Sequence, residues 1–153
     1  MITPKSNRKG FTLLEILIVI ALIAILIGIV VVALNPARQF ANARNATRQA
    51  HLNTIMNAIS SNMAENNGNF TCATGDLPDA ATNMGSGVAD YDIAPCLVPN
   101  FISAMPADPS ADDAHWTSAA DYNTGYTIIL GTDNRITVAA PTAELSTTIS
   151  LSR

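Results

Sequence analysis

The apolar positions of the chain are concentrated near its N-terminus. Residues 11–34 (FTLLEILIVIALIAILIGIVVVAL) form an almost continuous apolar run in which Glu15 is the only ionisable side chain. As a helix this run is about 36 Å long, which is enough to cross the hydrocarbon core of a bilayer. A carboxylate near the bilayer centre costs about 2.5–3.5 kcal/mol, and less near the interface. We therefore expect a membrane-spanning helix whose Glu15 needs a partner.

Three ordinary explanations of this run are a cleaved secretory signal, a signal anchor and the core helix of a soluble domain. The apolar core of a secretory signal has about 7–15 residues, which is far shorter than this run. The uncharged stretch from Ile16 to Leu34 is also too long for the core helix of a soluble domain. A signal anchor explains the length of the run, but it does not explain an acid one turn into the helix.

Residues 37–63 have the pattern of an amphipathic helix. Their apolar residues recur at steps of three and four and form one stripe: Leu52, Ile55, Met56, Ile59 and Met63. We expect the helix to end near Asn66, with Gly68 as a left-handed cap. Arg44 and Arg48 lie one turn apart. We expect each to be solvated or to face lipid headgroups, and the alternative is that they bridge to acids of neighbouring subunits.

The junction between the two helical regions contains Asn35-Pro36. Proline removes a helical hydrogen bond and restricts the residue before it, so the sequence predicts a kink at Pro36. Gly28 is a second weak point of the helix.

The C-terminal part of the chain has the pattern of an antiparallel sheet. Residues 126–130 (YTIIL) and 135–139 (RITVA) flank a turn at 131–134, which predicts a hairpin. Residues 145–151 (LSTTISL) supply a possible third strand. A sheet of three or four strands packed on the apolar stripe buries both apolar faces, so we expect an α+β fold. Turn residues dominate residues 70–105, and residues 97–109 are expected to form an apolar connector.

Charge is unevenly distributed along the chain of 153 residues, which suits one small domain and its helix. From Asn66 onward there are ten acidic residues and two basic ones, a net charge of −8. This region repels polyanions, so we expect no nucleic acid to bind there directly. Three basic residues precede the apolar run and three follow it closely, so the positive-inside rule does not decide the orientation.

Cys72 and Cys96 are the only cysteines. An even number of cysteines in an exported domain indicates a disulfide, and closing this loop contributes about 3.5 kcal/mol in the chain-entropy model. Neither cysteine has a second Cys or His close to it in sequence, so a metal pair has no support.

No phosphate loop, metal-ligand spacing or nucleophile motif is present in the sequence. His51 lies in the amphipathic helix, and His115 is expected in an acidic loop beside Trp116; an isolated His in such places is more often structural or solvated than catalytic. The acids Asp108, Asp112 and Asp113 lack the spacing of an EF-hand, and we expect a solvated acidic loop rather than a calcium site. The sequence thus predicts no enzyme activity, no catalytic residue, no cofactor and no metal.

The segment from Gly10 to Glu15 (GFTLLE) follows the basic residues Lys5, Arg8 and Lys9 and precedes the long apolar run. This combination resembles the class III signal of type IV pilins and pseudopilins. The resemblance implies cleavage between Gly10 and Phe11 by prepilin peptidase and N-methylation of the new Phe11 amine. It also implies that Glu15 meets the N-terminal amine of a neighbouring subunit. An α-amino group has a reference pKa of about 7.7–8.0, so its positive charge can neutralise a carboxylate in an apolar bundle.

The same resemblance implies a domain organisation and a function. Residues 1–10 would be a cleaved leader, 11–34 a transmembrane and filament-core helix, 35–66 its amphipathic continuation and 67–153 a globular domain, together the type IV pilin fold. The chain would polymerise with copies of itself, served by a platform protein of the inner membrane and a cytoplasmic assembly ATPase.

The precursor would span the membrane once with its N-terminus in the cytoplasm, and the mature chain would lie in a cell-surface pilus or a periplasmic pseudopilus. In some type IV pili, a segment between a glycine and a proline such as Gly28 and Pro36 unwinds in the filament. Residues 105–109 (MPADP) partly match the "LP-x-DP" segment of pilins and pseudopilins. A type II secretion pseudopilin is therefore one alternative, and a monomeric membrane-anchored extracellular binding domain is another.

Overall fold

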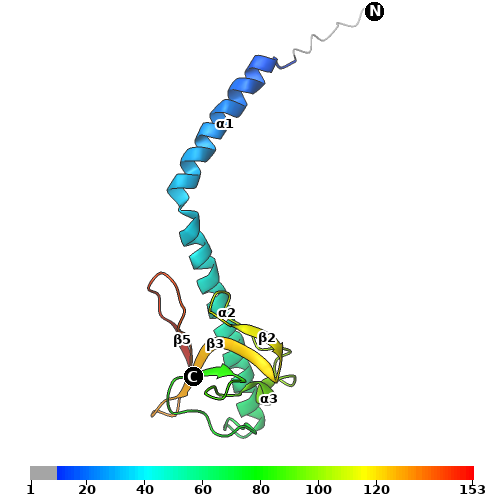
Figure 1. The fold of residues 1–153 in the computed structure, drawn as a ribbon, viewed down its shortest axis with the longest axis vertical. Helices are drawn as coiled ribbons and strands as arrows, with labels where there is room; N and C mark the ends of the chain where they lie inside the picture. Colours follow the sequence, from blue (N-terminus) through cyan, green and yellow to red (C-terminus); the bar gives the residue numbers. More distant parts are fainter. Residues whose placement is uncertain (1–9) are drawn as a thin grey trace, which may run out of the picture. The chain divides into compact units, whose positions relative to one another are not determined.

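A computed structural model describes residues 10–153 of the chain. The chain divides after Gln39 into two units, and each is described by itself. The N-terminal unit contains helix α1, Leu13–Leu34, and the beginning of helix α2, Pro36–Glu65 (Figure 1). The unit from Phe40 onward, called the globular unit below, contains the rest of α2, the short helix α3, Ala94–Leu97, and five strands.

The break between α1 and α2 is confined to one residue, Asn35. Its φ of 42° is left-handed, which ends α1, and α2 begins at Pro36. A proline suits the first position of a helix because its φ is already helical and no hydrogen bond is lost there. The backbone N–H of Arg38 donates to the Asn35 carbonyl at 3.1 Å. The structure thus interrupts the helix next to Pro36, whereas Gly28 lies inside α1.

Helix α2 ends as its composition predicts. Asn67 and Gly68 have positive φ values of 55° and 91°, and the Gly68 N–H donates to the Met63 carbonyl at 2.8 Å. This arrangement satisfies a carbonyl that the last helical turn leaves free.

The sheet is antiparallel and its strands run in the order β1-β3-β4-β5, with β2 also paired to the start of β3. The strands span the following residues: Thr82–Gly85 (β1), His115–Ser118 (β2), Asp121–Leu130 (β3), Ile136–Ala140 (β4) and Ile149–Ser152 (β5). The predicted hairpin is confirmed, with Leu130 opposite Ile136 and Thr127 opposite Ala139.

The sheet has more strands than the three or four that the sequence predicts. β1 and β2 lie in segments that read as turns, and β3 already starts at Asp121. His115 and Trp116 lie in β2 rather than in a loop, so that prediction was wrong. Both added strands have four residues and pair with β3. The partner of β1 is distant in sequence, whereas β2 forms a tight hairpin with the start of β3, with Ser118 opposite Asp121.

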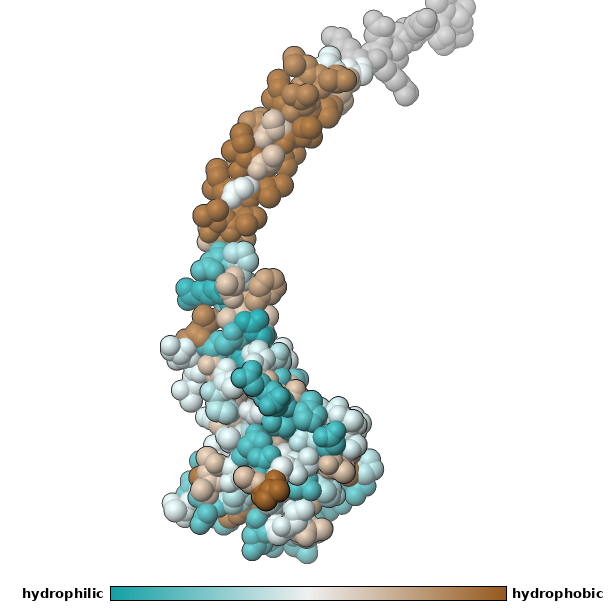
Figure 2. Space-filling view, viewed as in Figure 1, coloured by the Kyte–Doolittle hydropathy of each residue, from teal (hydrophilic) through white to brown (hydrophobic). Residues whose placement is uncertain are grey.

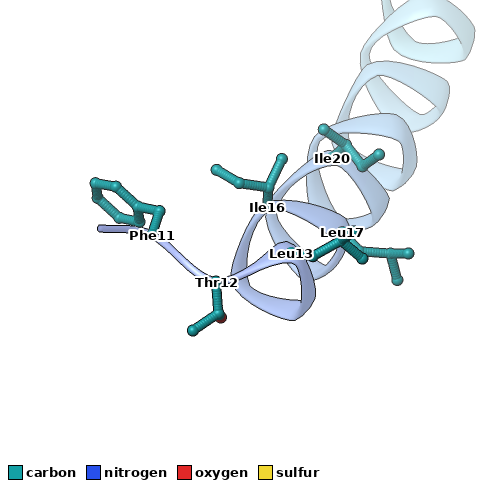
Figure 3. Close-up of a pocket in the computed structure, with 6 residues that line it drawn as sticks. All are labelled: Phe11, Thr12, Leu13, Ile16, Leu17 and Ile20. Carbon is teal, nitrogen blue, oxygen red and sulfur yellow. The ribbon is translucent and has the colours of Figure 1, made fainter. Parts of the chain in front are cut away.

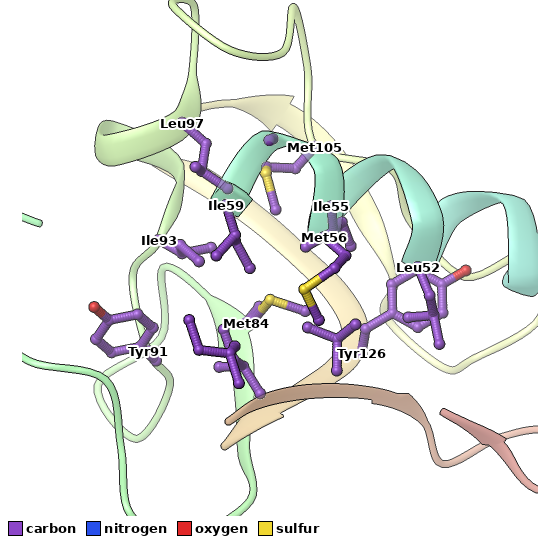
Figure 4. Packing of buried hydrophobic residues seen from close by; sticks show 14 of the residues in the cluster. Leu52, Ile55, Met56, Ile59, Met84, Tyr91, Ile93, Leu97, Met105 and Tyr126 are labelled. Atoms are coloured by element: carbon purple, nitrogen blue, oxygen red, sulfur yellow. The ribbon is translucent and has the colours of Figure 1, made fainter. Parts of the chain in front are cut away.

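The core of the globular unit lies between α2 and the sheet (Figure 4). The predicted stripe is confirmed, because Leu52, Ile55, Met56 and Ile59 are at most 1% exposed and Met63 packs at the edge of the cluster. The sheet contributes Tyr126, Ile128 and Val138 to the same cluster. The α+β fold expected from the sequence is therefore the fold of this chain.

The predicted disulfide is also present. It joins Cys72, which follows α2, to Cys96 in α3, with the two Cα atoms 5.2 Å apart. The turn-rich segment is thereby attached to the end of the long helix.

Candidate functional site

The first candidate site is the start of α1. Thr12 caps the helix, since its side-chain oxygen accepts a hydrogen bond from the Glu15 N–H at 3.2 Å. Phe11 precedes this cap and is 79% exposed, and none of the described residues, chain neighbours apart, comes within 4 Å of a Cβ added at Gly10. Figure 3 shows Phe11 and Thr12 with Leu13, Ile16, Leu17 and Ile20, which together line a shallow, mostly apolar hollow. The predicted leader residues Lys5, Arg8 and Lys9 lie outside the described residues.

Glu15 lies in the first turn of α1, where an acid interacts favourably with the helix dipole. Its carboxylate is exposed, and no cation among residues 10–153 lies within ion-pair distance of it. The one acid of the apolar run therefore has no partner within the described part of the same chain.

No residue of α1 is buried, although Glu15 is its only ionisable side chain. Figure 2 shows apolar side chains along this helix, in contrast to the mostly polar surface of the globular unit. By length and composition α1 is able to cross a membrane, and it fits the anchor of a membrane-bound precursor.

A second polar cluster lies in the globular unit around Arg48. Arg48 is 0% exposed and makes two parallel hydrogen bonds to Asp108, of 2.7 and 3.0 Å. It also donates to Ser110 at 2.7 Å, Asn45 at 2.9 Å and Glu144 at 3.0 Å. These contacts join α2 to the loop before β2 and to the loop between β4 and β5. We call these residues, together with Arg44, the Arg48 cluster.

The Arg48 cluster corrects two expectations from the sequence. Arg48 is not a solvated arginine, and Asp108 is not part of a solvated acidic loop, because it is only 5% exposed. Burial opposes the charge on Asp108, but hydrogen bonds from Arg48, the Ser110 N–H and the Thr142 hydroxyl outweigh it and lower the pKa of Asp108. Every buried charge is thus paired, as a buried ion pair requires.

The loop between β4 and β5 is attached to α2 at the same place. Arg44 makes two hydrogen bonds to Glu144, of 2.7 and 2.6 Å, so Arg44 is not simply solvated either. Asn45 donates to the Glu144 carbonyl and accepts from its N–H, at 2.8 and 3.0 Å. Hydrogen bonds from Arg44 and Arg48 lower the pKa of Glu144 to about 2.

A signal for the buried arginine was present in the sequence. Arg48 precedes Leu52 by four residues and Ile55 by seven, so it continues the apolar stripe of α2. The acid that it meets, Asp108, was considered only as part of a solvated acidic loop and of the segment 105–109, and not as the partner of an arginine.

The two histidines have different surroundings. The Nδ1 of His51 lies 2.9 Å from the hydroxyl of Tyr126, and partial burial lowers the pKa of His51. His115 is exposed beside the Asp113 carbonyl and Asp121, which raise its pKa. Among residues 10–153, no three His, Cys, Asp or Glu side chains are placed to hold a metal ion.

Comparison with known proteins bears on the N-terminal site alone. Residues 5–31 match the family described as "Prokaryotic N-terminal methylation motif". No curated protein and no solved structure matches the chain. The match covers the basic residues, the Gly10-Phe11 junction, Glu15 and most of α1. The chain therefore carries the class III signal of type IV pilins and pseudopilins, and its long apolar N-terminal helix and small antiparallel sheet match the α+β pilin fold.

Proposed function

We propose that the chain is the structural subunit of a type IV pilus-like filament. The observation that carries this proposal is α1, a 22-residue apolar helix with no buried residue and one acid, Glu15, in its first turn. Such a helix needs lipid or other helices around it. In the proposed filament, the α1 helices of neighbouring copies replace the lipid.

In the proposed filament, an ion pair between Glu15 and the N-terminal amine of a neighbouring copy sets how far the α1 helices are shifted along one another. Cleavage between Gly10 and Phe11 creates an amine four residues before Glu15, and N-methylation keeps its positive charge. The Glu15 carboxylate is exposed and has no cation of residues 10–153 within ion-pair distance, so the amine of a neighbouring copy can approach it directly. Two unit charges 4 Å apart attract each other by about 4 kcal/mol at an effective dielectric constant of 20. Apolar packing between helices gains little over lipid, so this charge pair selects one arrangement.

The break at Asn35 supports a further part of this proposal. We infer that residues 28–36 unwind when the subunit enters the filament, which would let the filament stretch. Asn35 already has a left-handed conformation, so the helix is interrupted at the end of this segment. A filament map at side-chain resolution tests this inference, and a continuous helix through Gly28–Pro36 in that map would contradict it.

The partners follow from the class III signal. Prepilin peptidase cleaves the precursor on the cytoplasmic side, and a platform protein and an assembly ATPase insert the subunit into the filament. The globular unit lies outside the cytoplasm, which the Cys72–Cys96 disulfide supports because such bonds persist in oxidising compartments. The mature chain then resides in a cell-surface pilus.

Two experiments test the proposal. Electron microscopy of sheared surface material should reveal long filaments that contain this chain. Their absence, with the chain retained in the envelope, would favour the alternatives: a periplasmic pseudopilus subunit of type II secretion or a monomeric anchored binding domain.

The second experiment compares Glu15→Ala with Glu15→Asp in the full chain. We expect the alanine variant to lose filaments while its disulfide still forms, and the aspartate variant to retain part of the assembly. Equal filament yield from wild type and the alanine variant would overturn the role of Glu15.

A further inference from the structure

The sequence contains two Asn-x-Thr triplets, Asn45-Ala46-Thr47 and Asn69-Phe70-Thr71. This triplet is the acceptor for N-linked sugars when it lies on the surface of an exported protein. The triplet alone is a weak signal, but the structure distinguishes sharply between the two copies.

The Asn45 side chain is buried in the globular unit and hydrogen-bonded there. It lies within α2, is 9% exposed and accepts a hydrogen bond from Arg48. It also bonds to both backbone polar groups of Glu144. A sugar would replace one of the two hydrogens on the side-chain nitrogen of this residue, which is 9% exposed and already donates to the Glu144 carbonyl.

Asn69 has the opposite surroundings. It follows Gly68 in the loop after α2 and is exposed, and its side chain makes no hydrogen bond with any of residues 10–153. Thr71, the third residue of the triplet, is exposed as well. The buried Asn62 holds the Thr71 backbone, donating to its carbonyl at 3.1 Å and accepting from its N–H at 3.0 Å. The Asn69 side chain therefore has no hydrogen-bond partner among residues 10–153. The backbone of the same triplet is held in place at Thr71 by Asn62.

A surface hollow lies next to Asn69. Apolar side chains of Met63, Phe70, Leu77, Leu130 and Ile136 line it together with the polar residues Asp76 and Asn134. A pyranose ring has an apolar face and a rim of hydroxyl groups, and aromatic and aliphatic side chains beside a carboxylate and an amide complement both. The first sugar of a glycan on Asn69 would be able to pack against these apolar side chains and form hydrogen bonds with the polar ones.

We propose that Asn69 is the site of an N-linked glycan. The donor is an oligosaccharide attached through pyrophosphate to a membrane lipid, and a membrane-bound transferase catalyses the step outside the cytoplasm. The Asn69 Nδ2 forms a bond to C1 of the first sugar, the bond between C1 and the phosphate oxygen breaks, and the amide proton leaves with the lipid pyrophosphate. The proposal requires export of the globular unit, which the disulfide supports, but it does not require a filament.

Mass spectrometry of the chain isolated from the cells that make it tests the proposal. Cleavage after Glu65 and before Asp76, followed by reduction, releases residues 66–75, which contain Asn69 and no other asparagine of an Asn-x-Thr triplet. We expect this peptide to carry a sugar series that fragmentation locates on Asn69, and we expect the peptide with Asn45 to be unmodified.

Matched variants of the same triplet complete the test. Asn69→Gln and Thr71→Val should lose the sugar completely, whereas Thr71→Ser should keep it, and alkylation of free thiols verifies that Cys72–Cys96 forms in each variant. An unmodified peptide 66–75 in the exported wild-type chain would overturn the proposal. A sugar on Thr71 or on Asn45, or one that survives in Thr71→Val, would overturn it equally.

Discussion

Arg44 and Arg48 lie one turn apart on α2, and replacing each by Met should have very different effects. Arg48 is fully buried and all of its contacts lie within the Arg48 cluster, whereas the Arg44 side chain is 36% exposed. Arg48→Met leaves the buried Asp108 carboxylate without its cation. Removing one partner of a buried ion pair typically costs about 3–5 kcal/mol. A small domain has a total stability of about 5–15 kcal/mol, so this loss is a large fraction of it.

The assay is thermal unfolding of purified residues 37–153, monitored by circular dichroism and by the fluorescence of Trp116. For a domain of this size, 1 kcal/mol shifts Tm by about 4–8 °C, so Arg48→Met should lower Tm by more than ten degrees or unfold the protein. Arg44→Met, the matched control, should cause a much smaller loss, because an exposed pair contributes little. A loss for Arg48→Met no larger than that for Arg44→Met would refute the reasoning.

A double variant keeps the test informative if Arg48→Met does not fold. In Arg48→Met with Asp108→Leu, no buried charge is left unpaired, and apolar replacement of an ion pair is often close to neutral. We expect this double variant to recover much of the lost stability. If it is as unstable as Arg48→Met, the loss does not come from the unpaired carboxylate.

Three further predictions concern the globular unit. Gly125→Ala should destabilise the fold by about 1–3 kcal/mol in urea unfolding, because Gly125 has a φ of 70° and an added Cβ would lie 3.0 Å from the side chain of Ala111; unchanged stability would contradict this. Replacing both Cys72 and Cys96 by Ala should lower the unfolding free energy by about 3.5 kcal/mol, and a loss below 1 kcal/mol would show that the loop is ordered without the bond. Because the pKa of Glu144 is lowered from 4.5 to about 2, its contribution to stability is complete above about pH 4.5 and is lost as the pH falls towards 2. Tm should therefore fall over that pH range, and it should fall less in Glu144→Gln; identical slopes would exclude Glu144 as a source.

The elements that were predicted correctly are those whose pattern is local. The apolar run, the stripe from Leu52 to Met63 and the hairpin around residues 131–134 each carry their own periodicity or turn residues. The disulfide was predictable because the chain offers a single pair of cysteines. β1 was missed because its conformation comes from pairing with β3, which is distant in sequence. The hairpin of β2 with the start of β3 is local, but its connection, Ala119-Ala120, contains none of the residues that mark a turn.

The polar contacts were harder to predict than the elements. The sequence suggested the same surroundings for Arg48 as for Arg44, which is four residues away. The partner of Arg48 in the structure is Asp108, which is 60 residues away in sequence. The loop before β2, which contains Asp108, lies against α2 only once the sheet has formed. For the N-terminal site the sequence is more informative than the structure, because Gly10, Phe11 and Glu15 define a motif whose proposed partner, the amine of another copy, lies outside a single chain.

The central claim is that the mature chain begins at Phe11 and polymerises through α1. Intact mass spectrometry of the chain from sheared filaments tests it most directly. The account predicts a polypeptide that runs from Phe11 to Arg153 with one added methyl group on its N-terminal amine, apart from any sugar. A chain that still begins at Met1, with no species starting at Phe11, would contradict it.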